Sequence, residues 1–140
     1  MQADKPALTP KLAPFALNWG IISTCDISIS FAHHLPLDPT SRNTREVKHK
    51  IAAVGSHSVQ SDQAFIEDVH NDPDVTAVYL GTPHVPHHCN AKDALLAGKH
   101  VLLEKPACLE VEELDELIKI AKEMSRFFMG VVWTPLQRIT

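Results

Sequence analysis

The segment Val75–Pro106 constrains the fold most, because a strand pattern, a helix pattern and a second strand pattern follow one another directly in it. Val75–Leu80 is a short apolar run with β-branched and aromatic residues, and a Gly-Thr-Pro turn follows it. Apolar residues at helical spacing come next, Gly98 supplies a left-handed stop, and His100–Leu103 forms the second apolar run. Such short joints predict two parallel neighbouring strands connected by a helix.

Polar residues follow both of these predicted strands. Thr82-Pro83-His84 comes after the first strand, and Glu104-Lys105-Pro106 comes after the second. In parallel sheets, ligands bind beyond the carboxyl ends of the strands. The sequence therefore predicts that both polar sets face one crevice, which is the candidate functional site.

The rest of the chain also alternates strands and helices. Residues 1–14 contain prolines without periodicity, and we expect them to form a flexible arm before a domain at 15–140. Between Val69 and Val75 no apolar run supplies the further strand and helix of a doubly wound half. We expect an α/β fold with a Rossmann-like doubly wound parallel sheet that lacks one strand–helix unit. The other strands are expected at Phe15–Ile22, His49–Val54 and Phe127–Trp133, and the other helices at Ile27–Leu35, Ser61–Val69 and Glu110–Arg126.

Length, charge and cysteine content restrict the class of protein. The 140 residues suffice for one domain, and 13 basic against 17 acidic residues give a net charge of −4 without a basic block. A nucleic-acid or anionic-membrane partner therefore has no electrostatic footprint, and a small molecule is the favoured partner. Three distant cysteines argue against a disulfide framework, and no apolar run is long enough to cross a bilayer. We expect a cytoplasmic protein.

The turn after the first predicted strand is a candidate phosphate cradle. In G-x-G-x-x-G turns, glycines let backbone N–H groups approach a pyrophosphate. Aligned on that pattern, Gly20 takes the first glycine position, Ile22 the second and Cys25 the third. Ser23 and Thr24 offer hydroxyls to phosphate oxygens. An ordinary strand–helix turn with a capping side chain explains the same residues, so both interpretations stay open.

The end of the second predicted strand bears on the choice of cofactor. A carboxylate there accepts from the ribose 2′-hydroxyl of NAD, whereas a cation favours the 2′-phosphate of NADP. The sequence offers Ser56, His57 and Ser58 and no carboxylate. These residues favour NADP over NAD, and a solvated turn histidine is the alternative.

His84, His87, His88 and Cys89 carry the side-chain types that ligate zinc. Their spacing places them at a turn and around the start of a helix, and no second pair follows at finger-like spacing. We therefore expect no metal site.

Several spaced motifs resemble one protein family. The motifs are Gly81-Thr-Pro-His84, His87, Ala97–Val101 and Glu104-Lys-Pro106. In these motifs the chain resembles the glucose–fructose oxidoreductase/inositol dehydrogenase (Gfo/Idh/MocA) family, over about residues 17–134. Trp19–Thr24 and the Gly-Thr-Pro-His motif look most like its branch of dimeric dihydrodiol dehydrogenase and NADP-dependent D-xylose dehydrogenase.

This resemblance implies an N-terminal Rossmann domain, a C-terminal mixed α/β domain, and hydride transfer between a nicotinamide cofactor and a sugar or related alcohol. It implies that Glu104 helps to hold the nicotinamide and that Lys105 is the catalytic residue beside the reacting hydroxyl, where an ammonium stabilises developing alkoxide charge. It also implies a cis Lys105–Pro106 bond, and it places His57 where this branch has an arginine for the 2′-phosphate. Together with the residues of the two turns above, the predicted cofactor-binding residues are Gly20, Ser23, Thr24, Ser56, His57, Thr82, Pro83, His84, His87, Glu104 and Lys105.

The sequence departs from the family pattern in ways that bear on activity. Cys25 replaces a glycine of the glycine-rich turn. The sequence also ends at Thr140, before the family's substrate domain. In the family, a tyrosine or histidine of that domain completes the proton relay, whereas Tyr79 here falls within a strand. We expect the nucleotide-binding domain of an NADP-dependent oxidoreductase for the CH–OH group of a sugar or trans-dihydrodiol, incomplete for catalysis alone. The alternative is a non-catalytic remnant that binds nucleotide weakly or pairs with a full-length relative, in a homo- or hetero-oligomer.

Overall fold

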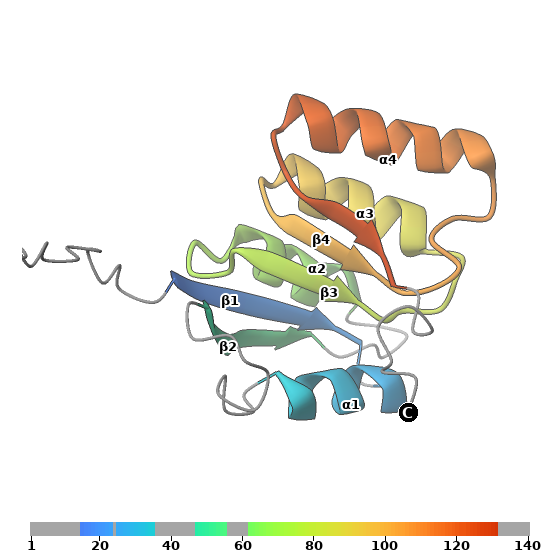
Figure 1. Ribbon diagram of the computed structural model, residues 1–140. Helices are drawn as coiled ribbons and strands as arrows, with labels where there is room; N and C mark the ends of the chain where they lie inside the picture. The colour runs from blue at the N-terminus through green and yellow to red at the C-terminus, as the bar shows by residue number, and fades with distance from the viewer. Residues whose placement is uncertain (1–14, 24, 36–46, 56–61, 132–140) are drawn as a thin grey trace, which may run out of the picture.

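The computed structural model describes residues 15–23, 25–35, 47–55 and 62–131, with side chains of the last range described from residue 66 onward. In this part of the chain the predicted alternation of strands and helices is confirmed, with small shifts at the element ends (Figure 1). The arm expected at residues 1–14 lies outside the described residues. The strands are β1 (Phe15–Ile22), β2 (Val47–Gly55), β3 (Ala77–Leu80), β4 (His100–Leu103) and β5 (Phe128–Gly130), and the helices are α1 (Asp26–His34), α2 (Asp62–Asn71), α3 (His87–Leu96) and α4 (Val111–Glu123).

The described strands form one parallel sheet in the order β2-β1-β3-β4-β5. This is the classical doubly wound order 3-2-1-4-5-6 without its strand 3. The predicted α/β Rossmann-like class, with one strand–helix unit missing, is therefore confirmed for the described residues. In the part of the chain that the structure describes, no strand pairs with the outer side of β2, so β2 is an edge of the sheet.

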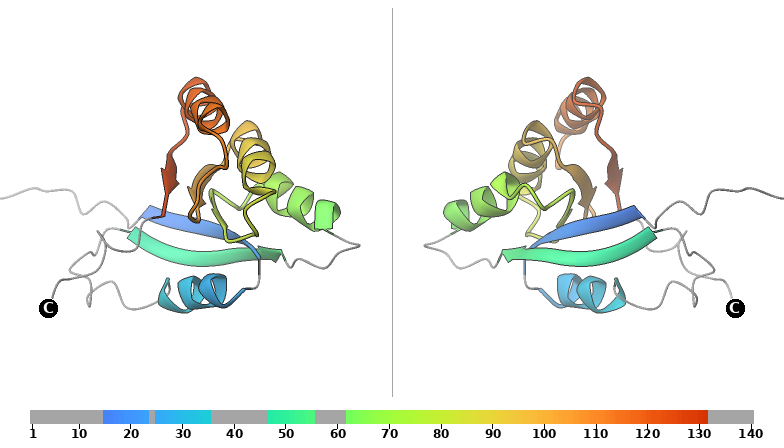
Figure 2. Two further views of the ribbon diagram at one scale, coloured as in Figure 1. Left: turned by 90° about the vertical axis from the view of Figure 1, so that its right-hand side faces the viewer. Right: turned by 90° about the vertical axis from the view of Figure 1, so that its left-hand side faces the viewer.

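Helices cover the two faces of the sheet unequally. Among the described helices, α2, α3 and α4 lie on one face and α1 lies alone on the other (Figure 2). The three-helix face holds the larger core, in which Leu80, Leu95 and Leu117 are fully buried. On the α1 face, Phe31 stacks on Tyr79 with ring centroids 4.0 Å apart. Side chains of β3 thus alternate between two cores, which holds this strand at the centre of the sheet.

Gly20 lies inside β1 and lets α2 pack closely on the sheet. A methyl group at this position would lie 2.5 Å from Cγ1 of Val69 and 3.2 Å from Cγ1 of Val75. The shorter distance is a steric overlap, so the approach of the Val69 side chain requires a glycine here. The structure therefore gives Gly20 a packing role in the middle of the strand.

Lys99, which belongs to the Ala97–Val101 motif, ties two strand–helix units together. Its side chain is buried, and Nζ donates hydrogen bonds to the carbonyl oxygens of Asp72 (2.6 Å) and Val75 (2.8 Å). Gly98 precedes it with a φ of 78°, which confirms the predicted left-handed stop. The lysine thereby supplies donors to two carbonyl groups between α2 and β3, of which that of Asp72 also accepts from the N–H of Val75 at 3.2 Å.

Candidate functional site

The carboxyl ends of β3 and β4 meet at the predicted crevice. The two strands pair in parallel with Leu80 opposite Leu103, and the N–H of Glu104 donates to the carbonyl oxygen of Leu80 at 2.9 Å. Thr82 and Glu104 therefore follow neighbouring strand ends at the same edge of the sheet, as predicted. The Lys105–Pro106 peptide bond is cis, which confirms what the resemblance implied.

His87 connects the two loops that form the crevice. Its side chain is fully buried, with Nδ1 2.8 Å from the carbonyl oxygen of Pro106 and Nε2 2.7 Å from that of Thr82. Carbonyl oxygens only accept hydrogen bonds, so a neutral imidazole donates to one of them and an imidazolium donates to both. The predicted cleft-lining residue His87 thus lies behind the wall of the crevice, where it positions the loops after β3 and β4.

Glu104 is a buried carboxylate in a defined orientation. It is 5 % exposed; Oε1 accepts a 2.6 Å hydrogen bond from the Tyr79 hydroxyl, and Oε2 accepts a 3.3 Å bond from the N–H of Lys105. Burial raises the pKa of Tyr79, and the hydrogen bond to Glu104 raises this pKa further, so the phenol stays protonated and donates. The Lys105 side chain is exposed. The two neighbouring residues therefore face different environments, as their position at a strand end predicts.

Sequence reasoning missed the contact between Tyr79 and Glu104, because it placed the tyrosine simply within an apolar strand. The register of β3 and β4 is the signal that could have revealed this contact. Tyr79 lies opposite Leu102, and Glu104 is two residues farther along the same strand direction, hence on the same side of the sheet. A buried tyrosine hydroxyl needs a hydrogen-bond partner, and Glu104 was the polar side chain within reach.

Thr82 is buried, whereas its predicted partners Pro83 and His84 are exposed. Oγ1 of Thr82 has no hydrogen-bond partner among the described residues. A buried hydroxyl without a partner costs about 1–3 kcal/mol, so a ligand atom that pairs with it is favoured. The ring of His84 packs edge-on against His87, with centroids 5.7 Å apart, which supports the turn that carries Thr82.

The strand-to-helix turn after β1 comprises residues 23–25, so the glycine alignment made on the sequence is wrong by three residues. Ser23 has a φ of 104°, the left-handed conformation that the first glycine of the pattern supplies. Cys25 is the N-cap of α1 and takes the second glycine position. Ser28 takes the third position, and it packs so closely that a methyl group on Gly81 would lie 2.2 Å from its Oγ. Thr24 lies outside the described residues.

Side chains that replace the glycines of this turn bond to one another. The Cys25 thiol donates to the carbonyl oxygen of Gly81 at 3.2 Å and lies 3.4 Å from Oγ of Ser28, and the Cys25 N–H donates to Oγ of Ser23 at 3.3 Å. Burial raises the pKa of the thiol, but hydrogen bonds with Ser23 and Ser28 outweigh burial and hold the pKa below its ordinary value. The turn is thus built without glycine, and it keeps a strained backbone at Ser23.

Replacing Ser23 by glycine is expected to raise the free energy of unfolding by about 1 kcal/mol, because glycine adopts a φ of 104° without strain. The loss of the 3.3 Å bond from the Cys25 N–H offsets a small part of this gain. Ser125→Gly is the matched control, since Ser125 has a φ of 53° far from the turn, and a similar gain is expected there. Urea unfolding measures both values. A loss of stability in Ser23→Gly alone would contradict the assignment of strain to this turn.

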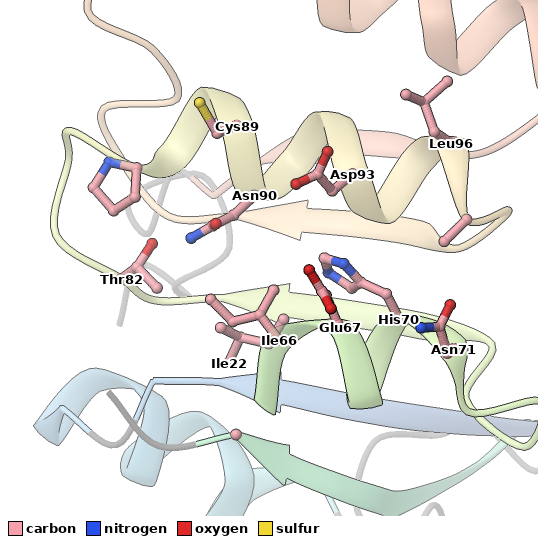
Figure 3. Close-up of a pocket in the computed structure, with 13 residues that line it drawn as sticks. Ile22, Ile66, Glu67, His70, Asn71, Thr82, Cys89, Asn90, Asp93 and Leu96 are labelled. Atoms are coloured by element: carbon pink, nitrogen blue, oxygen red, sulfur yellow. The ribbon is translucent and has the colours of Figure 1, made fainter. Parts of the chain in front are cut away.

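A groove of about 620 Å³ opens at the same edge of the sheet and continues between α2 and α3 (Figure 3). Ile22, Gly55 and Thr82 line the end of the groove that adjoins the strand termini. The volume lies within the range of about 300–1,000 Å³ that is usual for small-molecule sites. The groove reaches Thr82 after β3, whereas Glu104 and Lys105 after β4 are not among the residues that line it.

The histidines considered as zinc ligands make other contacts. Nε2 of His88 lies 2.7 Å from Oε2 of Glu116, and Nζ of Lys92 donates to Oε1 of the same carboxylate at 2.6 Å. Within the described ranges, no group of three or more His, Cys, Asp and Glu side chains is placed to hold a metal ion. His88 therefore takes part in a bridge between α3 and α4.

Comparison with known proteins identifies the family. Residues 36–131 match the Gfo/Idh/MocA oxidoreductases, described as an oxidoreductase family with an NAD-binding Rossmann fold. The chain belongs to this family. It is 35% identical over 137 residues to D-xylose 1-dehydrogenase (NADP(+)) of Hypocrea jecorina, which covers 86% of this chain and 35% of the relative. It is 33% identical over 125 residues to trans-1,2-dihydrobenzene-1,2-diol dehydrogenase of Bos taurus, which covers 85% of this chain and 37% of the relative.

A solved structure agrees with this membership of the Gfo/Idh/MocA family. A 3-ketoreductase from Actinomadura kijaniata, crystallised with TDP-benzene and NADP, superposes with a TM-score of 0.66 at 26% identity, over 84% of this chain and 38% of that chain. The present chain spans about a third of the length of the curated relatives named above. The family resemblance carried by the sequence motifs is thus confirmed. Ser56 and His57 lie outside the described residues, and the cofactor-binding roles of the predicted site residues stay predictions.

Proposed function

We propose that this Gfo/Idh/MocA chain is the NADP-binding part of an oxidoreductase that acts on the CH–OH group of a sugar or trans-dihydrodiol. The observation that carries the proposal is the crevice beyond β3 and β4, where the buried, oriented carboxylate of Glu104 precedes the exposed Lys105. The names of the two curated relatives point to D-xylose and a trans-dihydrodiol as model substrates. None of the described helices is long and apolar enough to cross a bilayer.

Residues at the crevice fit a nicotinamide cofactor. The buried hydroxyl of Thr82 has no partner among the described residues, and the Glu104 carboxylate, held by Tyr79, is oriented to accept hydrogen bonds. A bound nicotinamide supplies the hydride acceptor or donor. The Lys105 ammonium stabilises the negative charge that develops on the alcohol oxygen as its proton leaves. Exposed Pro83 and His84 would help to hold the cofactor.

NADPH is expected to bind about tenfold more tightly than NADH, because one favourable contact to the 2′-phosphate is worth about 1.4 kcal/mol. Fluorescence titration of the chain with each cofactor measures the ratio. Ser23→Gly is expected to tighten binding of both cofactors, because the turn then resembles the glycine pattern, whereas Ser125→Gly leaves both affinities unchanged. Equal affinities for NADPH and NADH would contradict the preference for NADP. Binding of neither cofactor would contradict the proposed function itself.

A non-catalytic role is the second candidate, and two observations favour it. Ser23, Cys25 and Ser28 stand at the three glycine positions, and β2 is an edge to which another chain can pair. In this role the chain binds nucleotide weakly or associates with a full-length relative. NADP-dependent oxidation of D-xylose that disappears in Lys105→Met supports catalysis. Nucleotide binding without any such rate is also expected of a nucleotide-binding part and does not distinguish the two roles.

A further inference from the structure

The ring of Tyr79 is packed tightly between α1 and the turn after β3. It is fully buried, and Phe31 of α1 stacks on it with an interplanar angle of 10°. Trp19 packs edge-on against Phe31 with ring centroids 5.3 Å apart, which supports the stacking ring. A methyl group on Gly81 would lie 3.2 Å from Cε1 of Tyr79, so the first residue of the turn lies close to the phenol ring. Packing on the α1 face of the sheet therefore fixes the position of the Tyr79 hydroxyl.

This hydroxyl determines which way the Glu104 carboxylate faces. It donates to Oε1 at 2.6 Å, whereas the N–H of Lys105 donates to Oε2 at 3.3 Å. The shorter bond has the length of a charge-assisted bond from a hydroxyl to a carboxylate, and it is the stronger of the two. Each carboxylate oxygen has two acceptor sites, so Oε2 keeps the capacity to accept a further hydrogen bond from a ligand.

Tyr79 acts on the crevice only through Glu104. Burial raises the pKa of the phenol, and the hydrogen bond and the negative charge of Glu104 raise this pKa further. The phenol therefore keeps its proton at neutral pH and does not relay one to a substrate. Because its side chain is also fully buried, it does not touch a ligand in the crevice itself. Holding the carboxylate is the role that remains for it.

We propose that Tyr79 is a positioning residue whose hydroxyl turns Oε2 of Glu104 toward the carboxamide group of a nicotinamide. This inference rests on the proposed function. A buried carboxylate repels phosphate groups and pairs with N–H donors, and the carboxamide is the part of the nicotinamide ring that carries N–H donors. The terminal torsion of a glutamate side chain has a broad range, so without the hydroxyl the carboxylate rotates and Oε2 is no longer held toward the ligand.

Isothermal titration calorimetry with NADP⁺ and its 3-acetylpyridine analogue tests the proposal. The analogue carries a methyl ketone in place of the carboxamide, so it has no N–H to donate to Glu104. The wild-type chain is expected to bind NADP⁺ about tenfold more tightly than the analogue. In Tyr79→Phe this ratio of affinities is expected to fall to about two, because the acceptor oxygen is no longer held in place.

Val78→Ala is the matched control for the loss of stability. Val78 precedes Tyr79 in β3, is fully buried, and belongs to the core on the opposite face of the sheet, so its truncation destabilises the fold without removing a hydrogen bond. Both dinucleotides bind only the folded chain, so the ratio of their affinities does not depend on the folded fraction. Val78→Ala is therefore expected to keep the tenfold ratio. An unchanged ratio in Tyr79→Phe, or an equal fall in both variants, overturns the positioning role.

Fluorine NMR gives a measurement that leaves the hydroxyl in place. Tyr79 is the only tyrosine of the chain, so incorporation of 3-fluorotyrosine puts a single fluorine beside this hydroxyl. Saturating NADP⁺ is expected to shift the resonance more than the saturating analogue does, because a second donor to Glu104 changes the hydrogen bond from Tyr79. Equal shifts, or equal affinities of the wild-type chain for the two dinucleotides, overturn this inference and leave the proposed function standing. Binding of neither dinucleotide overturns the proposed function and the inference that rests on it.

Discussion

Replacing His87 by leucine is expected to lower the free energy of unfolding by about 2 kcal/mol, because the carbonyl group of Thr82 or Pro106 loses the imidazole N–H that it accepts from. The imidazole lies between the carbonyl oxygens of Thr82 and Pro106, at 2.7 and 2.8 Å. Leucine fills a similar volume but donates nothing, and the fully buried site leaves no room for water to replace the ring nitrogens. Denaturant unfolding followed by circular dichroism measures the difference.

His88→Leu is the matched control for this variant. His88 is the next residue of α3, and it bonds a carboxylate of Glu116 that remains partly exposed, so a loss below about 1 kcal/mol is expected. NADPH affinity gives a second measurement, because the loops after β3 and β4 are held together by His87 and not by His88. Equal losses of stability in the two variants would show that the ring nitrogens of His87 contribute nothing beyond packing.

Tyr79→Phe is expected to lower the free energy of unfolding by about 2 kcal/mol, because a hydrogen bond to a buried charged group is lost. Phenylalanine keeps the stacking on Phe31 and removes only the hydroxyl that donates to Glu104 at 2.6 Å. A double-mutant cycle with Glu104→Gln isolates the interaction, and the two changes are expected to be strongly non-additive. Additive losses would mean that the hydroxyl and the carboxylate contribute independently.

The pH dependence of this variant provides a separate check. The pKa of Tyr79 is raised in the folded protein, so below the unfolded pKa of about 10 both states keep the proton and the full stabilisation is present. Above about pH 10 only the unfolded chain loses the proton, so the wild-type protein loses stability that Tyr79→Phe cannot lose. The difference between the two proteins is therefore expected to shrink as the pH rises above about 10. Tyr79 is the only tyrosine of the chain, which keeps the comparison free of other phenols.

Local patterns were sufficient to predict the elements and their order. The β-branched run that ends at Leu80, the left-handed stop at Gly98 and the apolar stripe of α4 depend on residues near one another in the chain, so their structures follow from local preferences. The missing strand–helix unit was also predictable, because a buried strand needs an apolar run and none lies between Val69 and Val75. The crevice then followed from the rule for parallel neighbouring strands.

Contacts between distant segments explain where sequence reasoning was wrong or silent. The alignment of the glycine turn began at Gly20. A glycine is required there by the close packing of Val69, which belongs to α2 and lies over β1. The turn lies at Ser23, which has a left-handed backbone conformation that a serine in the sequence does not predict. The role of His87 depends likewise on the carbonyl of Pro106, 19 positions away along the chain.

The sequence by itself determined the class of the fold, the family and the edge of the sheet at which the polar residues gather, because each depends on local periodicity or on short motifs. Tertiary structure alone decided what those polar residues do. It buried His87 behind the crevice, joined Tyr79 to Glu104, and gathered His70, Thr82 and Asn90 along one groove. The physical reason is that a polar group's role is set by whether it is buried and by which partner it meets, and both come from elements brought together only on folding.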